Sequence, residues 1–185
     1  MREHLHFMEQ AADIDVICAN VTDSSGAMWI PAQLGLGVPY WNRNIRGAWI
    51  GLDLATNRAH LIRAVLEGIA ALVVQIIRAM LKDTGLTIEY LQVDGGLTRS
   101  KTMMQIQADL LGYPVAVLEN PEATAMGVCA LAARETGIWK SDETILKLLN
   151  KTHIYQPSIS ADEREAFLRR FDKAVKHLKA WHDDE

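Results

Sequence analysis

The stretch YLQVDGGLTRS, residues 90–100, runs from apolar residues into an acid, two glycines and a hydroxyl-rich turn. Its apolar part belongs to a predicted strand over residues 88–93, which stops at Asp94. A helix with apolar residues at helical spacing is predicted from about Ser100 to Leu111. In an α/β sheet, ligands bind beyond the carboxyl ends of the strands, so this strand end is where a site is expected.

Glycine at this strand end gives the backbone the freedom that a nucleotide site needs. Gly95 and Gly96 have no Cβ, so the main chain can adopt positive φ and approach a purine or a phosphate closely. The N–H groups of residues 98–102, where the next helix starts, are expected to face the same corner. We therefore predict a nucleotide site here. The alternative is an ordinary strand-to-helix turn that tolerates glycine.

A dinucleotide-binding fold is a second hypothesis for the ligand. Glu119 closes the next predicted strand, roughly where such folds place an acid for a ribose hydroxyl. The spacing disagrees, because the fingerprint GxGxxG needs three glycines and the run from Gly95 to Ser100 has two adjacent ones. The phosphate-binding pattern GxxxxGK[ST] does not occur anywhere in the sequence.

Predicted strands and helices alternate outward from this stretch. The strands are expected at residues 27–30, 48–52, 88–93 and 114–118, and the helices at residues 2–17, 57–82, 100–111, 124–136 and 160–181. Residues 31–47 contain three glycines and two prolines and are expected to form an irregular loop. This alternation predicts one α/β domain over residues 1–185, with a largely parallel sheet and flanking helices.

Several residues are expected to mark the ends of helices. Asn57 and Thr124 are predicted N-caps, and Gly85 and Gly112 are predicted to end helices in the left-handed conformation. Gly127 lies inside a predicted helix, where glycine costs about 1 kcal/mol relative to alanine. It therefore indicates close helix-to-sheet packing or a close approach of the backbone to a ligand.

Composition excludes several classes of partner. The formal charge is −4 and the pI about 5.9, so we expect no affinity for nucleic acid or anionic membranes, which requires clustered Lys and Arg. Cys18 and Cys129 form no CxxC pair, and the first ten residues lack the apolar run of a secretory signal, which predicts a cytoplasmic protein. Residues 61–81 are strongly apolar, but Arg63 and Glu67 would be costly in a bilayer. We predict a buried helix of a soluble protein there.

No carboxylate or histidine has the surroundings of a catalytic group. Asp53, Asp94 and Asp109 each lack an identifiable partner in the sequence, and capping or solvated roles are commoner for such residues. His60, near a helix start, is expected to be structural. We therefore assign no catalytic residue and no metal ligand.

Several long segments resemble the FGGY family of carbohydrate kinases. GAWIGLDLATNRAHLIRAVLE (residues 47–67) is similar to its second signature, and residues 93–115 and 121–139 look like its adenosine-binding strand, turn and helices. Within the family, the loop at residues 31–47 and the tail at residues 155–181 are most similar to the glycerol kinases. The resemblance covers nearly the whole chain. Departures from the family pattern leave the acceptor open to another polyol or sugar; they are Gln33, Asn42, Asn44 and Phe171.

The resemblance implies an actin-like, ribonuclease-H-like ATPase fold, of which this chain is part of the C-terminal domain. It implies that the full kinase uses ATP and Mg²⁺ to phosphorylate a hydroxyl group, as kinases do through metal-bound phosphates. By the same resemblance, Asp94, Gly95, Gly96 and Ser100 bind the adenine nucleotide, with the two glycines under the adenosine and Ser100 near the base or ribose.

The resemblance also implies what another segment must supply. In this family an N-terminal kinase domain contributes the phosphate-binding loop and most acceptor contacts, and the catalytic aspartate comes near the start of the second domain. We therefore expect the isolated chain, a truncated gene product or fragment, to be inactive alone. The alternative hypothesis is a stand-alone nucleotide-binding or protein-interaction module, with self-association into a homo-oligomer as one outcome.

Overall fold

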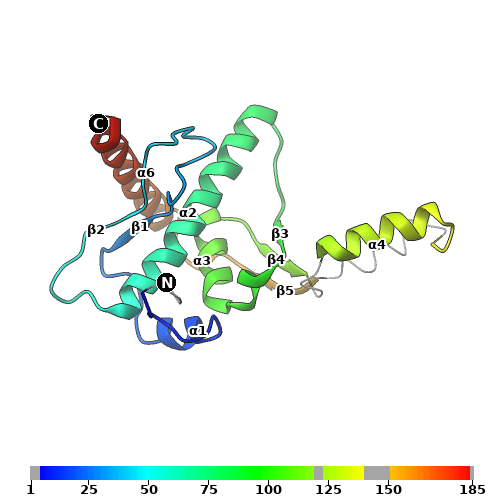
Figure 1. The fold of residues 1–185 in the computed structure, drawn as a ribbon, viewed down its shortest axis with the longest axis horizontal. Coiled ribbons are helices and arrows are strands. Elements are labelled where there is room, and N and C mark those ends of the chain that lie inside the picture. The colour runs from blue at the N-terminus through cyan, green and yellow to red at the C-terminus, as the bar shows by residue number, and fades with distance from the viewer. Residues whose placement is uncertain (1–4, 119–122, 140–150, 184–185) are drawn as a thin grey trace.

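The computed structural model describes residues 5–118, 123–139 and 151–183, whose arrangement is shown in Figure 1. The helices are α1 (Asp13–Cys18), α2 (Arg58–Thr84), the 3-10 helix η1 (Gly96–Arg99), α3 (Lys101–Leu111), α4 (Ala123–Glu135) and α6 (Ala161–Asp183). The strands are β1 (Met28–Ile30), β2 (Ala48–Ile50), β3 (Leu91–Val93), β4 (Val115–Leu118) and β5 (Lys151–Tyr155).

The strands form two separate sheets. β3 and β4 pair in parallel, with Leu91 opposite Val115, and β5 joins β4 in the antiparallel sense, with Tyr155 opposite Val115. β1 and β2 form an antiparallel pair of their own. The predicted mixture of strands and helices is confirmed, but the largely parallel sheet is wrong, because β3 and β4 are the only two of the described strands that pair in parallel. The sequence does not predict β5 because KTHIY has neither a run nor an alternation of apolar residues.

The long helix α2 lies at the centre of the molecule, with α1, α3, α6 and β1 against it (Figure 1). The side chain of Asn57 accepts hydrogen bonds from the N–H groups of Ala59 and His60 at its start, and Gly85 ends it in the left-handed conformation. Both predicted caps are confirmed. Nδ1 of His60 accepts a hydrogen bond from the N–H of Asn57 at 3.2 Å, which confirms the structural role expected for this histidine.

The hydrophobic core surrounds α2. Its largest fully buried side chains include Ile30, Ile45, Ile62, Leu66, Val74, Val115, Leu168 and Phe171. α2 crosses β1 so closely that a Cβ at Gly68 would lie 2.1 Å from the carbonyl oxygen of Trp29. Only glycine fits at this crossing.

The composition of α2 would also suit a membrane span. Arg58–Thr84 is long and apolar enough to cross a bilayer, and half of its most apolar window is buried inside the structure. The predicted burial of this helix is thus confirmed, since α1, α3, α6 and β1 cover it.

The N-terminal segment departs from its prediction. The helix expected over residues 2–17 begins only at Asp13, and the preceding described residues form turns and bends. His6 adopts a φ of +52°, which a helix does not allow, and the ring of Phe7 lies 6.0 Å from that of Trp49. The chain therefore turns inward to bury Phe7 and Met8 instead of continuing a surface helix.

Helix α4 extends away from the rest of the molecule (Figure 1). Thr124, the predicted N-cap, is instead the second residue of this helix. The side chains of Val128 and Leu131 are 65% and 69% exposed although both are apolar. A Cβ at Gly127 would meet no atom within 4 Å, so the close-packing explanation of this glycine is wrong.

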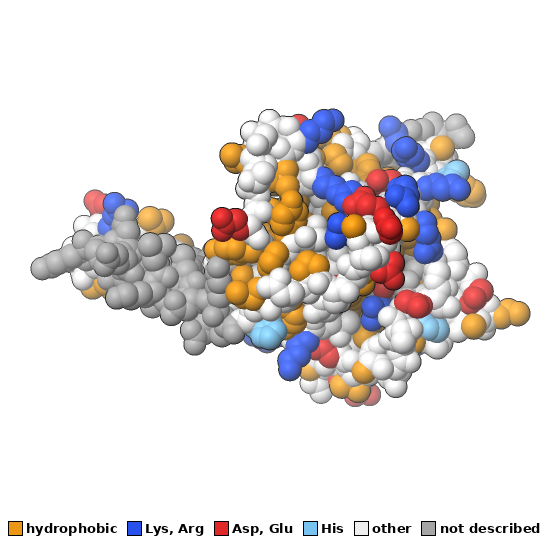
Figure 2. All heavy atoms as spheres, turned by 180° about the vertical axis from the view of Figure 1, so that it is seen from behind, with side chains coloured by type: hydrophobic (Ala, Val, Ile, Leu, Met, Phe, Trp, Pro, Cys, Tyr) orange, Lys and Arg blue, Asp and Glu red, His pale blue; other side chains and the backbone are white. Residues whose placement is uncertain are grey.

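Helix α6 covers β1 and α2 with its apolar side. Leu168, Phe171 and Val175 are buried, as predicted. Acidic and basic side chains gather over α6 on the rear face, beside a group of apolar side chains (Figure 2). Glu165 accepts a hydrogen bond from Arg78 of α2 and so ties the two helices together.

Candidate functional site

Two glycines leave the main chain without side chains where β3 ends. Asp94 is exposed, Gly95 has a φ of +91°, and Gly96 opens the 3-10 helix η1. A Cβ built on Gly95 or Gly96 would meet no other atom within 4 Å. A flat ligand could therefore reach the backbone here without displacing a side chain.

Hydrogen bonds hold the turn in shape. The carbonyl oxygen of Gly95 accepts from the N–H of Thr98 at 3.1 Å and from its hydroxyl at 2.7 Å. The N–H of Ser100 donates to the carbonyl oxygen of Leu97 at 3.2 Å. The open backbone is thus preformed, which lowers the conformational entropy that binding would cost.

Ser100 faces the interior of the molecule. It is buried, and its hydroxyl caps α3 by accepting from the N–H of Met103 at 3.1 Å. The same hydroxyl donates to Oδ1 of Asp15 at 2.6 Å. Of the four predicted nucleotide-binding residues, Asp94, Gly95 and Gly96 lie on the open side of the turn, and Ser100 connects it to α1.

Asp15 occupies the N-terminus of α3. Its carboxylate accepts from the N–H groups of Lys101 at 2.9 Å and Thr102 at 3.2 Å, besides the hydroxyl of Ser100. Burial raises the pKa of Asp15, but these hydrogen bonds outweigh it and hold the pKa below the usual value. The N–H groups of residues 101 and 102, which were expected to face the ligand corner, therefore bind Asp15 instead. The sequence offers no local pattern for Asp15, because its partners lie 85 to 87 residues away.

The other acids have structural partners. Asp53 accepts from the hydroxyl of Thr56 at 2.8 Å, and this hydrogen bond lowers the pKa of Asp53. Asp109 accepts from the N–H of Ser158 at 2.6 Å, which fixes the segment before α6. Both carboxylates therefore have structural partners, but neither caps a helix, because Asn57 caps α2 and Ser100 caps α3. Among the residues that the structure describes, no group of three or more His, Cys, Asp or Glu could hold a metal ion.

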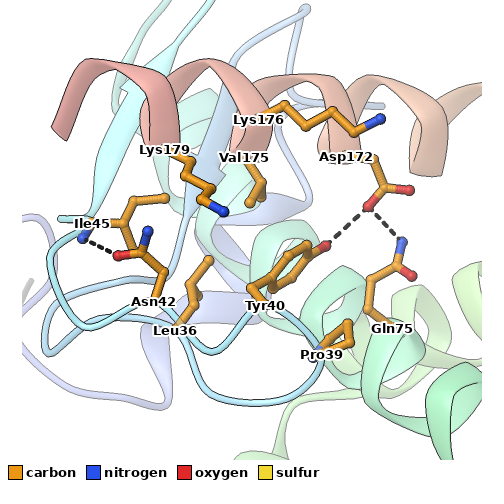
Figure 3. Close-up of a pocket in the computed structure, with 10 residues that line it drawn as sticks. All are labelled: Leu36, Pro39, Tyr40, Asn42, Ile45, Gln75, Asp172, Val175, Lys176 and Lys179. Carbon is orange, nitrogen blue, oxygen red and sulfur yellow. Dashed lines mark hydrogen bonds between the residues drawn. The ribbon is translucent and has the colours of Figure 1, made fainter. Parts of the chain in front are cut away.

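A second hollow lies away from this turn, between the loop of residues 31–47, α2 and α6 (Figure 3). Its volume is about 400 Å³. Tyr40 and Gln75 both donate to Oδ1 of Asp172, each at 2.9 Å. Sequence reasoning missed this group, since its members are 97 and 132 residues apart from Asp172.

Comparisons with known proteins identify the sequence pattern. Residues 7–136 match the family model described as the C-terminal domain of the FGGY family of carbohydrate kinases. A glycerol kinase of Deinococcus radiodurans is 38% identical over 184 residues, covering 100% of this chain and 37% of the relative. A glycerol kinase of Bordetella parapertussis is 38% identical over 181 residues, covering 98% of this chain and 36% of the relative. The chain thus spans about a third of the length of these curated relatives.

Solved structures share the fold. The crystal structure of Plasmodium falciparum glycerol kinase with ADP matches at a TM-score of 0.84 and 27% identity, covering 94% of this chain and 35% of that one. The xylulose kinase of Rhodospirillum rubrum matches at a TM-score of 0.78 and 28% identity, covering 98% of this chain and 36% of that one. These similarities confirm the predicted actin-like fold class.

Proposed function

The chain belongs to the FGGY family of carbohydrate kinases, and from this premise we propose that it is the nucleotide-binding part of a glycerol kinase-like enzyme. The complete enzyme would transfer the γ-phosphate of ATP to a hydroxyl of glycerol or a similar polyol. The observation that carries the proposal is the open, preformed backbone at Gly95 and Gly96. A relative whose structure contains ADP supports a nucleotide as the ligand.

The geometry of the turn fits the nucleoside end of ATP. A purine is flat, and Gly95 and Gly96 present backbone with open space above them. Asp94 is exposed next to them and could hydrogen-bond to a ribose hydroxyl or to metal-bound water. The role of Ser100 would be indirect, because its hydroxyl holds Asp15 and caps α3.

The described residues fit Mg²⁺ less well than they fit the nucleoside. Mg²⁺ is commonly bound by one or two carboxylates together with substrate phosphates, and this turn offers a single exposed carboxylate, Asp94. We therefore assign no step through the metal to this chain. The chain would hold and orient the nucleotide so that its γ-phosphate is correctly placed for transfer.

The exposed face of α4 supports the need for a further segment. Val128 and Leu131 of α4 are 65% and 69% exposed, and Ile138, just after the helix, is 73% exposed, which is unusual for neighbouring apolar side chains in a folded domain. The relatives carry nearly two thirds of their length outside the matched part. We propose that part of this additional segment, including an N-terminal kinase domain, covers α4 and supplies the catalytic base.

The cysteines fit a cytoplasmic location for such an enzyme. Cys18 and Cys129 are both free thiols. Burial raises the pKa of Cys18 to about 11, so this thiol is unreactive at neutral pH.

Nucleotide binding can be tested at the turn itself. Gly96→Leu places a side chain in open space, so the variant should fold normally but block the corner. We expect its affinity for ATP, measured by isothermal titration calorimetry, to fall at least tenfold. Gly37→Leu is the matched control, because a Cβ at Gly37 also meets no atom within 4 Å. Equal affinity of the two variants would rule out the turn as the site.

Phosphoryl transfer requires a separate experiment. The chain is mixed with Mg-ATP and glycerol, with and without the N-terminal part of the Deinococcus radiodurans glycerol kinase that the match does not cover. We expect phosphorylation of glycerol only in the mixture. Turnover by the chain alone would contradict the proposal that another segment supplies the catalytic base. Nucleotide binding without complementation would favour the alternative, a stand-alone module.

A further inference from the structure

The hollow between the loop of residues 31–47, α2 and α6 has the size of a small-molecule site. Its volume is about 400 Å³, which corresponds to about a dozen water molecules and lies within the range of known ligand pockets. Four residues of α6 line it at helical spacing, so that one side of the helix forms a continuous wall. They are Asp172, Val175, Lys176 and Lys179.

The walls of this hollow are mostly apolar. Leu36 and Ile45 of the loop and Val175 of α6 are all buried and line it from opposite sides. Figure 3 shows their side chains converging on one space. Apolar lining with few polar groups is the common composition of pockets that take small organic ligands.

A rigid polar group closes one end of the hollow. Oδ1 of Asp172 accepts from the hydroxyl of Tyr40 and from Nε2 of Gln75, both at 2.9 Å (Figure 3). Burial, followed by the nearby Asp172 carboxylate, raises the pKa of Tyr40, so its hydroxyl stays protonated and keeps donating. The two hydrogen bonds hold the Asp172 side chain in place and give this end of the hollow a fixed shape.

Two lysines and one aspartate line the hollow, so its net charge is positive. Figure 3 shows the ammonium group of Lys179 pointing into the space between Leu36 and Tyr40. Lys176 lies on the same wall. Within residues 5–118, 123–139 and 151–183, neither lysine has a carboxylate within ion-pair distance. Both lysines are exposed, so a ligand that places an anionic group against them and an apolar body against the walls would match both features of the hollow.

We propose that this hollow binds a small apolar carboxylate, such as a medium-chain aliphatic or aromatic acid of roughly a dozen non-hydrogen atoms. Its apolar body would lie against Leu36, Ile45 and Val175, and its carboxylate would pair with Lys179. The proposal concerns a surface separate from the Gly95–Gly96 turn and does not depend on kinase activity.

Octanoate is a suitable probe for the full 185-residue chain. Methyl NMR titration should show saturable shifts confined to the methyl groups of Leu36, Ile45 and Val175. Octanol retains the apolar tail and acetate retains the carboxylate, and each should bind at least tenfold more weakly than octanoate. Shifts at other methyl groups, or octanol binding as tightly as octanoate, would overturn the proposal.

Charge removal tests the role of the lysine. Lys179→Gln should weaken octanoate binding about tenfold or more, because it removes a charge-assisted hydrogen bond. Lys173→Gln is the matched control, since this exposed lysine lies on the same helix and does not line the hollow. Equal affinities for the two variants would refute the pairing. Loss of octanoate binding in both variants would show nonspecific charge attraction and would also refute it.

Discussion

The carboxylate of Asp15 offers the sharpest test of how this fold is held together. It joins α1 to the start of α3 through hydrogen bonds to Ser100, Lys101 and Thr102. Hydrogen bonds to a charged group contribute a net of about 1.5–3 kcal/mol each when they are well formed and shielded from water. Asp15 is half-buried, so we expect Asp15→Ala to lower the free energy of unfolding by about 2–3 kcal/mol in total.

Urea denaturation followed by tryptophan fluorescence would measure this loss. With a slope of about 2 kcal/mol per molar urea, the midpoint should fall by roughly 1 M. Asp83→Ala also removes one carboxylate from an exposed position, and as the control it should change stability by less than about 0.5 kcal/mol. If both variants shift the midpoint equally, the Asp15 hydrogen bonds do not stabilise the fold.

The contribution of Asp15 should also depend on pH. Its pKa is lower in the folded chain than the ordinary value of about 3.9. The stabilisation is therefore fully present above pH 4 and is lost as the pH falls through the folded pKa. The difference between wild type and Asp15→Ala should be constant from pH 7 to pH 5 and should shrink below pH 4. A difference that stays constant at pH 3 would refute the role of the charged form.

Other substitutions test the packing of α2 and the exposure of α4. Gly68→Ala should lower the free energy of unfolding by about 3 kcal/mol or more, because its Cβ would lie 2.1 Å from the carbonyl oxygen of Trp29. Gly127→Ala, in open space within α4, should instead be neutral or stabilise by up to about 1 kcal/mol. The urea midpoints of the two variants measure this difference, and an equal loss of stability in both would contradict the close crossing of α2 and β1. Burial raises the pKa of Glu67, although the nearby Arg63 opposes the shift. The stability that protonated Glu67 contributes is therefore present below about pH 4 and is lost as the pH rises through the folded pKa. Wild type should therefore lose stability relative to Glu67→Gln between pH 4 and pH 7, and a pH-independent difference would show that this carboxyl does not titrate in that range.

Local chemistry explains why the long helices could be predicted from the sequence. Asn57 and Gly85 bound α2, and Ser100 and Gly112 bound α3, because capping depends on side chains within three or four residues. The irregular loop at residues 31–47 was predictable for the same reason, since its glycines and prolines interrupt any regular element.

Long-range pairing explains what the sequence could not predict. The role of Asp15 and the cluster around Asp172 depend on partners more than 80 residues away, and no local pattern records them. The first helix begins at Asp13 and not at residue 2, because Phe7 packs against the ring of Trp49 instead of lying on a surface helix. The strand β5 pairs with the edge of β4, and this pairing depends on tertiary structure and not on the local sequence.

The contact between α6 and β1 sets an order of events during protein synthesis. Ile30 and Phe171 are both fully buried, yet about 130 residues separate the start of β1 from the start of α6. At ordinary elongation rates, the ribosome needs on the order of ten seconds to make that stretch. The part of β1 that α6 covers must therefore stay exposed during this time, although α2 is already available to pack against β1. A chaperone that shields this part during translation would protect the nascent chain from aggregation.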